Sequence, residues 1–366
     1  MGNPILETKP NVVNENIEAH SYMFYSVGKT GKTRLANSFP NSFMFDLEKS
    51  GDCIPGIMRK EIVDWEDLEL WVSYLADPEV KKKFKMIIFD TGDKMLEMAK
   101  EYLRVQYNKK LREKSTNDDG SVKPYKKAET FGDMNVNGKQ WEQAGLLVSK
   151  LLDKVFRIYG YGLILNVHCK EVVEKVKDSD GKEISIKTYT TDVNDRYGKM
   201  FNNLVDVIGF IQNEDVMENG VLTSKPFVYF RGSRRFFAGS RFKYIQTKAE
   251  FNYRSVEKAI KEAIKKEKEL AGNEFFIDED KEMLEDPEIQ EKYDKCMDYI
   301  KSIHTYLFNN FKNHATMSFN DFWNPQLQDI INKNLGKKVS ETTKEDLEGV
   351  MNTARDIQNL IKRYSY

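Results

Sequence analysis

Cysteine is scarce in this sequence, and long apolar runs are missing. The three cysteines, Cys53, Cys169 and Cys296, have neither a paired spacing nor the spacing of metal ligands, which favours reduced thiols. No run approaches the length of a membrane span, and the first residues, MGNPILETKP, lack the apolar core of a signal peptide. We therefore expect a cytoplasmic protein that makes no contact with a membrane.

A dominant charge is also missing. The 366 residues include 57 Lys and Arg against 58 Asp and Glu, so the formal net charge is −1. Any attraction for nucleic acid must then come from a local basic patch. The hydrophobic fraction of 40% is enough for a core, and the length allows two domains or one large α/β domain with an appendage.

Short apolar runs alternate with amphipathic segments over much of the chain. Buried strands are predicted from the apolar runs at 20–25, 42–46, 85–90 and 162–171. Because helical patterns separate these runs, the sequence predicts an α/β fold, with a mostly parallel sheet flanked by helices. From about residue 255 the sequence becomes highly charged and helical in pattern. We expect three parts: a tail at 1–18, an α/β core at 19–254 and an α-helical region at 255–366.

The stretch SVGKTGKT contains Gly-Lys-Thr twice and raises the question of which lysine contacts a nucleotide. A phosphate-binding loop has the pattern Gly-x-x-x-x-Gly-Lys-[Ser/Thr] between a strand and a helix. If Lys29 were its lysine, the loop would begin at Met23, inside the apolar strand. With Lys32 the loop begins at Ser26, after the strand. The sequence therefore predicts Lys32 as the phosphate lysine and Thr33 as a Mg²⁺ ligand.

This loop departs from the pattern at its first position, where Ser26 replaces glycine. A small residue is often sufficient there, and Gly28 and Gly31 keep the backbone free to approach phosphate. Lys29 adds a second charge, which either contacts a phosphate or is solvated. The predicted ATP-binding segment comprises Ser26, Val27, Gly28, Lys29, Thr30, Gly31, Lys32, Thr33 and Arg34.

Carboxylates follow two of the predicted strands. Asp90 ends the run MIIFD, where a P-loop protein needs an acid that holds Mg²⁺. The run SFMFD is followed by Glu48, which could deprotonate an attacking water molecule. The alternatives are a helix cap for Asp90 and a solvated loop charge for Glu48. The order of loop and acids favours a site for ATP and Mg²⁺.

These segments together carry a family resemblance. The run YSVGKTGKTRLANSFPNSFMFDLEKSG is followed in order by MIIFDT, GKQWEQAG, LILNVHCKE, LVDVIGFI and FFAGSRFKYI. Over residues 19–250 the chain resembles the RecA-like P-loop ATPases of phages, the Sak-type group implicated in single-strand annealing and recombination. The resemblance implies ATP hydrolysis, self-association into a ring or filament, and a bacterial host cytoplasm.

The resemblance also implies roles for single residues. Lys32 and Thr33 would bind nucleotide and Mg²⁺, Asp90 would be the Walker B acid, and Glu48 the catalytic base. His168, after LILNV, would be a polar sensor that couples the γ-phosphate to the segment beyond it. A lone histidine after an apolar strand is otherwise a hydrogen-bonded structural residue, and both readings stay open.

The segment 225–248 is basic and aromatic. It has seven basic residues, no acidic one, and seven Phe or Tyr residues interleaved with them. Cations that follow phosphates and rings that stack on bases are what single-stranded DNA binding needs, although we expect most of these rings to be buried. The DNA-binding candidates here are Arg231, Arg234, Arg235 and Lys243.

Two further basic features bear on assembly and DNA. Arg241 is the first choice for a residue that reaches the nucleotide of a neighbouring subunit, and Arg234 or Arg235 could serve there as well as on DNA. The predicted hairpin at 172–191 is where a RecA-like protein would place a DNA-binding loop. Its candidates are Lys175 and Lys177, although acidic neighbours dilute their charge.

Two hypotheses from different classes follow. In the first, the protein binds and hydrolyses ATP and acts on single-stranded DNA in phage recombination or replication. In the second, it is a nucleotide-dependent switch or scaffold whose C-terminal helices bind a protein, such as a single-strand-binding or other replication protein. A small-molecule kinase is a third reading, which the lack of an obvious lid disfavours.

Overall fold

The computed structural model describes residues 8–117, 120–177, 183–193, 195–218, 220–284, 286–312 and 316–364. The chain divides into two compact units, Met1–Leu284 and Glu285–Tyr366. Each unit has its own apolar core, and each is described by itself. Among the described residues, no helix combines the length and the apolar character that crossing a membrane requires.

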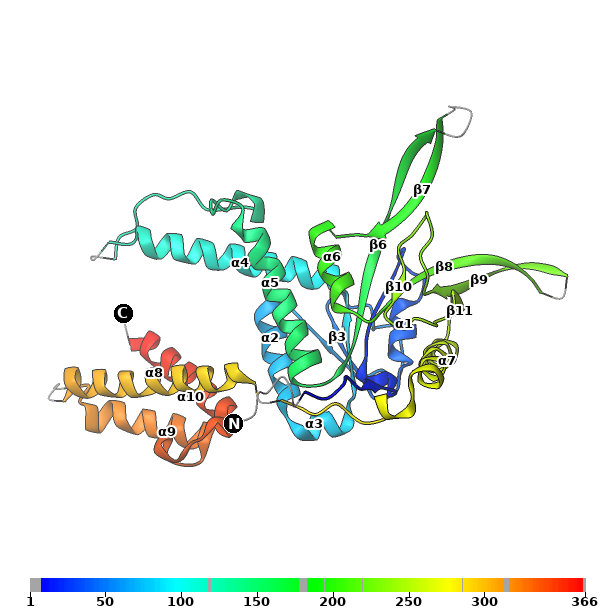
Figure 1. Ribbon diagram of the computed structural model, residues 1–366. Helices are drawn as coiled ribbons and strands as arrows, with labels where there is room; N and C mark the ends of the chain where they lie inside the picture. Colours follow the sequence, from blue (N-terminus) through cyan, green and yellow to red (C-terminus); the bar gives the residue numbers. More distant parts are fainter. Residues whose placement is uncertain are drawn as a thin grey trace. The chain divides into compact units, whose positions relative to one another are not determined.

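A ten-stranded sheet forms the centre of the first unit (Figure 1). The strand order is β11-β9-β8-β2-β6-β5-β3-β4, with β10 paired to β8 and β7 to β6. The six strands from β8 to β4 are mutually parallel, whereas β7, β9, β10 and β11 pair antiparallel. The strand bounds are Ser21–Ser26 (β2), Ser42–Asp46 (β3), Arg59–Glu61 (β4), Met86–Asp90 (β5), Gly162–Lys177 (β6), Glu183–Thr191 (β7), Val207–Glu218 (β8), Val221–Tyr229 (β9), Gly239–Ser240 (β10) and Lys248–Glu250 (β11).

Helices cover both faces of this sheet. Alternate residues of β2 point to opposite faces: Tyr22 and Phe24 enter one core cluster, and Met23 and Tyr25 the other. The first cluster contains residues of α1 (Lys32–Asn37) and α7 (Tyr253–Ala271). Residues of four other helices line the second cluster: α2 (Trp65–Ser73), α4 (Gly92–Ser115), α5 (Lys139–Asp153) and α6 (Asp195–Leu204). A further short helix, α3 (Pro78–Lys83), precedes β5.

The predicted fold class is confirmed. The central strands are apolar, parallel and separated by helices, as in a P-loop NTPase with a RecA-like sheet, and a helical C-terminal region is present. Strands β3 and β5 lie within the runs predicted at 42–46 and 85–90. The sequence also favours a turn at Asp180-Gly181 for the hairpin predicted at 172–191, but these two residues lie outside the described residues.

The helix expected to open the C-terminal region belongs to the first unit. Val256, Ile260 and Ile264 of α7 are buried in the core cluster beneath the sheet. The segment expected as a tail also packs there in part, because β1 (Val13–Asn14) pairs parallel with β12 (Phe276–Ile277). The first compact unit therefore extends beyond the expected boundary at residue 254, as far as Leu284.

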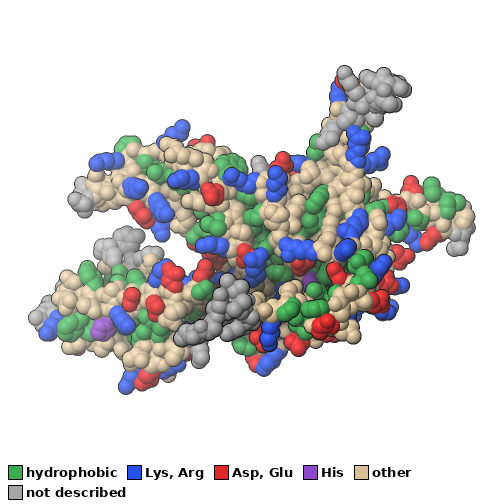
Figure 2. Space-filling view, in the orientation of Figure 1, with side chains coloured by type: hydrophobic (Ala, Val, Ile, Leu, Met, Phe, Trp, Pro, Cys, Tyr) green, Lys and Arg blue, Asp and Glu red, His purple; other side chains and the backbone are tan. Residues whose placement is uncertain are grey.

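Two hairpins project from the sheet (Figure 1). One is formed by the outer parts of β6 and β7, the other by β8 and β9. The end of the β8–β9 hairpin carries exposed hydrophobic side chains, which Figure 2 shows as a green group at its tip: Met217, Val221 and Leu222. Strand β6 extends to Lys177, beyond the run predicted at 162–171.

The second unit is helical. It contains α8 (Pro287–Phe311), α9 (Asn324–Leu335) and α10 (Leu347–Tyr364). Aliphatic and aromatic side chains from all three helices, with Phe319 and Trp323 between α8 and α9, form its core.

Candidate functional site

The strand register gathers polar residues at one edge of the sheet. Ser26 of β2 is aligned with His168 of β6, and Asp46, Asp90 and Asn166 are aligned across β3, β5 and β6. Because these strands are parallel, the loops after them meet at the same edge, where open α/β sheets bind their ligands. The candidate site is therefore built from strand ends.

The loop after β2 has the geometry of the register that begins at Ser26. Lys32 is buried and donates to the carbonyl oxygen and Oγ of Ser26, at 3.3 and 3.1 Å, while Lys29 is exposed. Gly31 has a φ of 96°, and a Cβ atom there would lie 3.2 Å from the Phe251 ring. Ser26 thus replaces the expected first glycine and contributes a hydroxyl oxygen that holds Lys32.

Burial lowers the pKa of Lys32, and the negative charge of Asp90 opposes that shift in part. In a phosphate-binding loop, the backbone N–H groups wrap the phosphates and the lysine ammonium group reaches the outer ones. Only Lys32 occupies this position, because the side chain of Lys29 is exposed to solvent.

A hydrogen-bond network surrounds Asp90. One carboxylate oxygen, Oδ2, accepts from Thr33 Oγ1 and from Ser50 Oγ, each at 2.6 Å. The other, Oδ1, accepts from Asn166 Nδ2 at 3.2 Å. Asp90 is buried at the end of β5, and its three partners come from α1, the loop after β3 and strand β6. Thr33 and Asp90, the two residues expected to hold Mg²⁺, are in direct contact.

The two acids that follow β3 have different surroundings. Asp46 is fully buried, pairs with Arg59, and accepts from the backbone N–H groups of Ser50 and Gly51 at 3.0 Å each. It therefore shapes the loop after β3 and is not available to a ligand. Glu48 is partly exposed and accepts from Thr91 Oγ1 at 2.9 Å.

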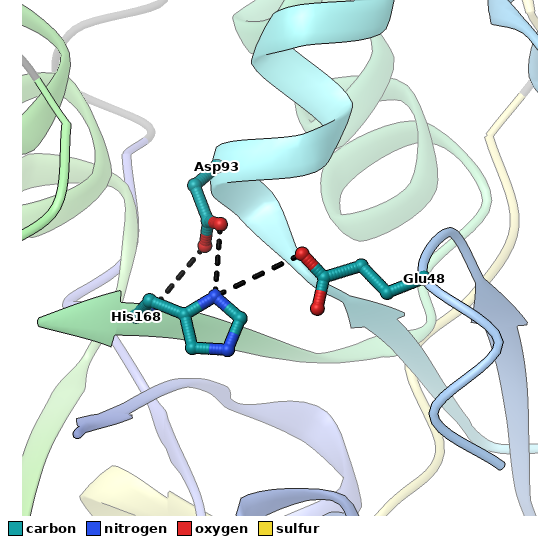
Figure 3. A group of neighbouring side chains, drawn as sticks. All are labelled: Glu48, Asp93 and His168. Carbon is teal, nitrogen blue, oxygen red and sulfur yellow. Dashed lines mark hydrogen bonds and ion pairs between the residues drawn. The ribbon is translucent and has the colours of Figure 1, made fainter. Parts of the chain in front are cut away.

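Glu48, Asp93 and His168 form a cluster (Figure 3). The backbone N–H and the ring Nδ1 of His168 contact the two carboxylate oxygens of Asp93, each at 3.0 Å. The same Nδ1 lies 3.8 Å from Glu48 Oε1. The ring thus faces both carboxylates, and α4, the loop after β3 and β6 each supply one member.

Their electrostatics are linked. The hydrogen bond to Asp93 raises the pKa of His168. Burial opposes ionisation of Asp93, but its hydrogen bonds with His168 outweigh burial and lower its pKa. Burial raises the pKa of Glu48, which the Thr91 hydrogen bond and His168 partly oppose. A carboxylate with a raised pKa is a better proton acceptor than an ordinary glutamate.

The basic segment after β9 divides into structural and exposed residues. Arg231 donates to the carbonyl oxygens of Phe242 and Lys243, at 3.2 and 2.6 Å, so it holds the chain together. Arg234 and Arg235 are exposed, and Phe237 is the most exposed ring of the segment, at 55%. Of the other six rings in this segment, Phe230 and Phe242 are buried and four are half-buried, so the expectation that most of the rings are buried is wrong. The side chain of Lys243 is exposed and lies over the Tyr244 ring.

This exposed loop lies near the candidate site. The hydroxyl of Tyr25, one residue before the loop that holds Lys32, donates to the carbonyl oxygen of Phe237. The backbone N–H of Tyr189 in β7 donates to the carbonyl oxygen of Arg235 at 2.6 Å. Residues 231–238 are therefore tied to both the central strand β2 and the projecting hairpin.

Arg241 is placed at the other edge of the sheet. Its guanidinium donates to Asp206 Oδ1 at 3.1 Å and to the carbonyl oxygen of Asn203 at 2.8 Å. Asp206 binds Ser21, at the start of β2, whereas the phosphate-type loop follows the end of that strand. The two ends of β2 are roughly 17 Å apart at about 3.3 Å per residue. Within one chain, the structure does not bring Arg241 to the site.

The lysines of the β6–β7 hairpin are partly paired. Lys175 lies 3.6 Å from Glu183, and Lys187 lies 2.9 Å from Glu171. The side chain of Lys177 lies outside the described residues. The described part of the hairpin carries basic side chains at its base (Figure 2), but its carboxylates offset them.

Four residues of the network were missed by sequence reasoning: Ser50, Thr91, Asp93 and Asn166. Asn166 could have been found, because it stands two positions before His168 in an otherwise apolar strand and therefore shares its face. Asp93 gave no such signal, because an acid in the first turn of a helix is ordinary.

The parallel sheet, the loop after β2 and the acid after β5 define a P-loop NTPase. A family model described as an AAA domain matches residues 18–242, more than half of the chain, and the chain belongs to this family. No curated protein sequence matches it. Among the solved structures that match is the KaiC-like protein PH0186 of the hyperthermophilic archaeon Pyrococcus horikoshii OT3, with 12% identity and a TM-score of 0.30. The alignment covers 64% of this chain and 85% of that chain.

Proposed function

We propose that the protein binds ATP with Mg²⁺ and hydrolyses it. The observation that carries this proposal is the contact of Thr33 Oγ1 with Asp90 Oδ2 beside the buried Lys32. A hydroxyl and a carboxylate oxygen are the hard donors that Mg²⁺ prefers, and the second oxygen of Asp90 is already oriented by Asn166. Thr33 and Asp90 would hold the ion, which supplies positive charge to the phosphates.

The remaining residues have roles that follow from their positions. Lys32 binds the outer phosphates, and the backbone of residues 28–33 surrounds them. Glu48 accepts a proton from the attacking water, and the hydrogen bond from Thr91 orients its carboxylate. Positive charge on His168, which Asp93 favours, stabilises negative charge near Glu48.

We further propose that single-stranded DNA is the partner. Exposed Arg234, Arg235 and Phe237 combine cations for phosphates with a ring for base stacking, on a loop tied to β2. We also propose that the protein self-associates. Arg241 lies away from the nucleotide site of its own subunit, and it could therefore reach the nucleotide of a neighbouring subunit. The setting in phage recombination or replication rests on the resemblance of the sequence to the phage annealing ATPases.

The test is ATP hydrolysis by the purified protein with and without single-stranded DNA, for wild type, Lys32→Ala and Glu48→Gln. We expect stimulation by DNA, and we expect both substitutions to abolish turnover. ATP binding without stimulation would reject the DNA hypothesis. No binding of nucleotide at all would reject the ATPase.

One observation favours the second hypothesis, a nucleotide-dependent scaffold. The C-terminal unit has its own core, and a cavity of about 320 Å³ lies between α9 and α10, lined by Asp329, Lys333, Asp356 and Arg363 among others. Such a mixed-charge groove suits a polar protein segment, for example from a replication protein. Removal of residues 285–366 would abolish partner binding under this hypothesis and leave nucleotide binding intact.

A further inference from the structure

The cluster of Glu48, Asp93 and His168 has a ligand set that differs from that of the Mg²⁺ site. It offers one imidazole nitrogen and two carboxylate oxygens, and these three atoms all lie within 4.8 Å of one another. Thr33 and Asp90 offer oxygen only. Imidazole nitrogen favours borderline transition ions such as Zn²⁺, whereas Mg²⁺ prefers oxygen ligands.

The distances are close to those between two ligands of a single ion. Zn²⁺ binds imidazole nitrogen and carboxylate oxygen at about 2.0–2.2 Å, so two ligands of one ion are roughly 3.0–3.6 Å apart. His168 Nδ1 lies 3.0 Å from Asp93 Oδ2 and 3.8 Å from Glu48 Oε1. The distance from Nδ1 to Asp93 lies within this range, and the carboxylate of Glu48 must move closer to enter it. Figure 3 shows that both carboxylates approach the same ring nitrogen.

The cluster is also accessible. The side chains of Glu48, Asp93 and His168 are 27%, 19% and 30% exposed, so an ion can enter and water can complete its coordination. Three protein ligands with water in an open fourth position are typical of catalytic zinc sites. Asp93 and His168 are held by α4 and β6, and therefore two of the three ligands need no large movement.

We propose that Glu48, Asp93 and His168 form a second cation site that binds Zn²⁺ and inhibits hydrolysis. The ion replaces the proton that joins Nδ1 to Asp93, and it engages the carboxylate that would otherwise accept a proton from water. The inhibitory consequence rests on the proposed ATPase function, whereas binding of the ion does not.

The experiment measures ion binding first, without nucleotide. The full-length protein, stripped with a chelator and carrying Cys53→Ser to remove an exposed thiol, is titrated with Zn²⁺ by calorimetry and with Co²⁺ by visible absorption. We expect one ion per chain, and a loss of affinity of about tenfold or more in His168→Ala and Asp93→Asn. His304→Ala, in the C-terminal unit, is the matched control and should bind as wild type. An excess of Mg²⁺ should not displace the ion.

Hydrolysis is measured second, at fixed excess Mg²⁺ with increasing free Zn²⁺, relative to each variant's own rate without zinc. We expect inhibition in the wild type and in His304→Ala over the range where calorimetry shows binding. Absence of saturable binding, or equal binding in His168→Ala, would overturn the site. Binding without inhibition would overturn its inhibitory role. If no variant hydrolyses ATP, the ATPase proposal fails while the binding data still decide the site.

Discussion

Asp93 contacts His168 twice, once at the backbone N–H and once at the ring Nδ1, both at 3.0 Å. Two contacts fix both the position of the β6 backbone and the orientation of the ring. Nδ1 also lies 3.8 Å from Glu48, the proposed base. Asp93, which the sequence did not predict, therefore positions His168 beside Glu48.

This pair predicts a pH dependence of stability. The raised pKa of His168 stabilises the fold below the ordinary histidine value of about 6.5, and this stabilisation is lost as pH rises through the folded-state pKa. The lowered pKa of Asp93 stabilises the fold above about 3.8 and is lost as pH falls through the folded-state pKa. Asp93→Asn should therefore lower the free energy of unfolding most near pH 5–6, by about 1–2 kcal/mol, and by less at pH 9.

Urea unfolding at the two pH values, followed by tryptophan fluorescence, measures this difference. Three of the four tryptophans, Trp65, Trp71 and Trp141, are in the first unit and report on it. A cost that does not change with pH would mean that the pair acts without its charges.

The two lysines of the loop should differ. Lys32→Ala removes the buried ammonium group and should weaken ATP binding by about 10–100-fold, as expected for a charge-assisted hydrogen bond. Lys29→Ala removes the same charge from the same loop at an exposed position and should weaken ATP binding about threefold or less. Calorimetric titration with a non-hydrolysable ATP analogue measures both, and a larger loss in Lys29→Ala would reverse the assignment.

Two glycines of the loop form another matched pair. Gly31→Ala places a Cβ atom 3.2 Å from Phe251 at a φ of 96°, and should destabilise the fold by about 1 kcal/mol or more. A Cβ atom at Gly28 meets nothing within 4 Å, so Gly28→Ala should change the free energy of unfolding little. Equal stability of the two variants would contradict the described backbone of Gly31.

The exposed loop predicts a salt effect on DNA binding. Replacing Arg234 and Arg235 by alanine should weaken binding of single-stranded DNA and reduce the slope of log K against log salt by about 0.7 for each phosphate that is no longer neutralised. Lys258→Ala with Lys261→Ala on α7 removes the same charge elsewhere and serves as the control. Fluorescence anisotropy at several salt concentrations gives the slopes. Equal effects of both pairs would indicate a response to net charge alone.

The parts of the fold that depend on local pattern could be predicted. The apolar runs predicted as strands correspond to β3 and β5, which end in Asp46 and Asp90. The spacing of the phosphate-loop motif also distinguished Lys32, the expected phosphate ligand, from Lys29. The contrast between Asp46 and Glu48 could not be predicted, because it depends on Arg59, which arrives from a later strand. The contact of Asp93 with His168 likewise joins residues 75 positions apart.

The expected domain boundary shows a second limit. The charged pattern of α7 suggested an independent region, yet its apolar stripe packs beneath the sheet. A charged amphipathic helix looks the same in sequence whether its apolar side covers a sheet or another helix. Similarly, Arg241 lies away from the phosphate-binding loop because β10, just before it, pairs with β8. No local sequence pattern predicted this short strand.

Strand β6 begins in the centre of the sheet and continues without interruption into the projecting hairpin. Its sixteen residues thus share one backbone between the nucleotide edge and the outermost part of the unit. A slip of this strand by one position would turn Asn166 and His168 to the opposite face, so its register cannot adjust gradually. A force that pulls on the hairpin would therefore be transmitted along the backbone of β6 to Asn166 and His168 at the nucleotide edge.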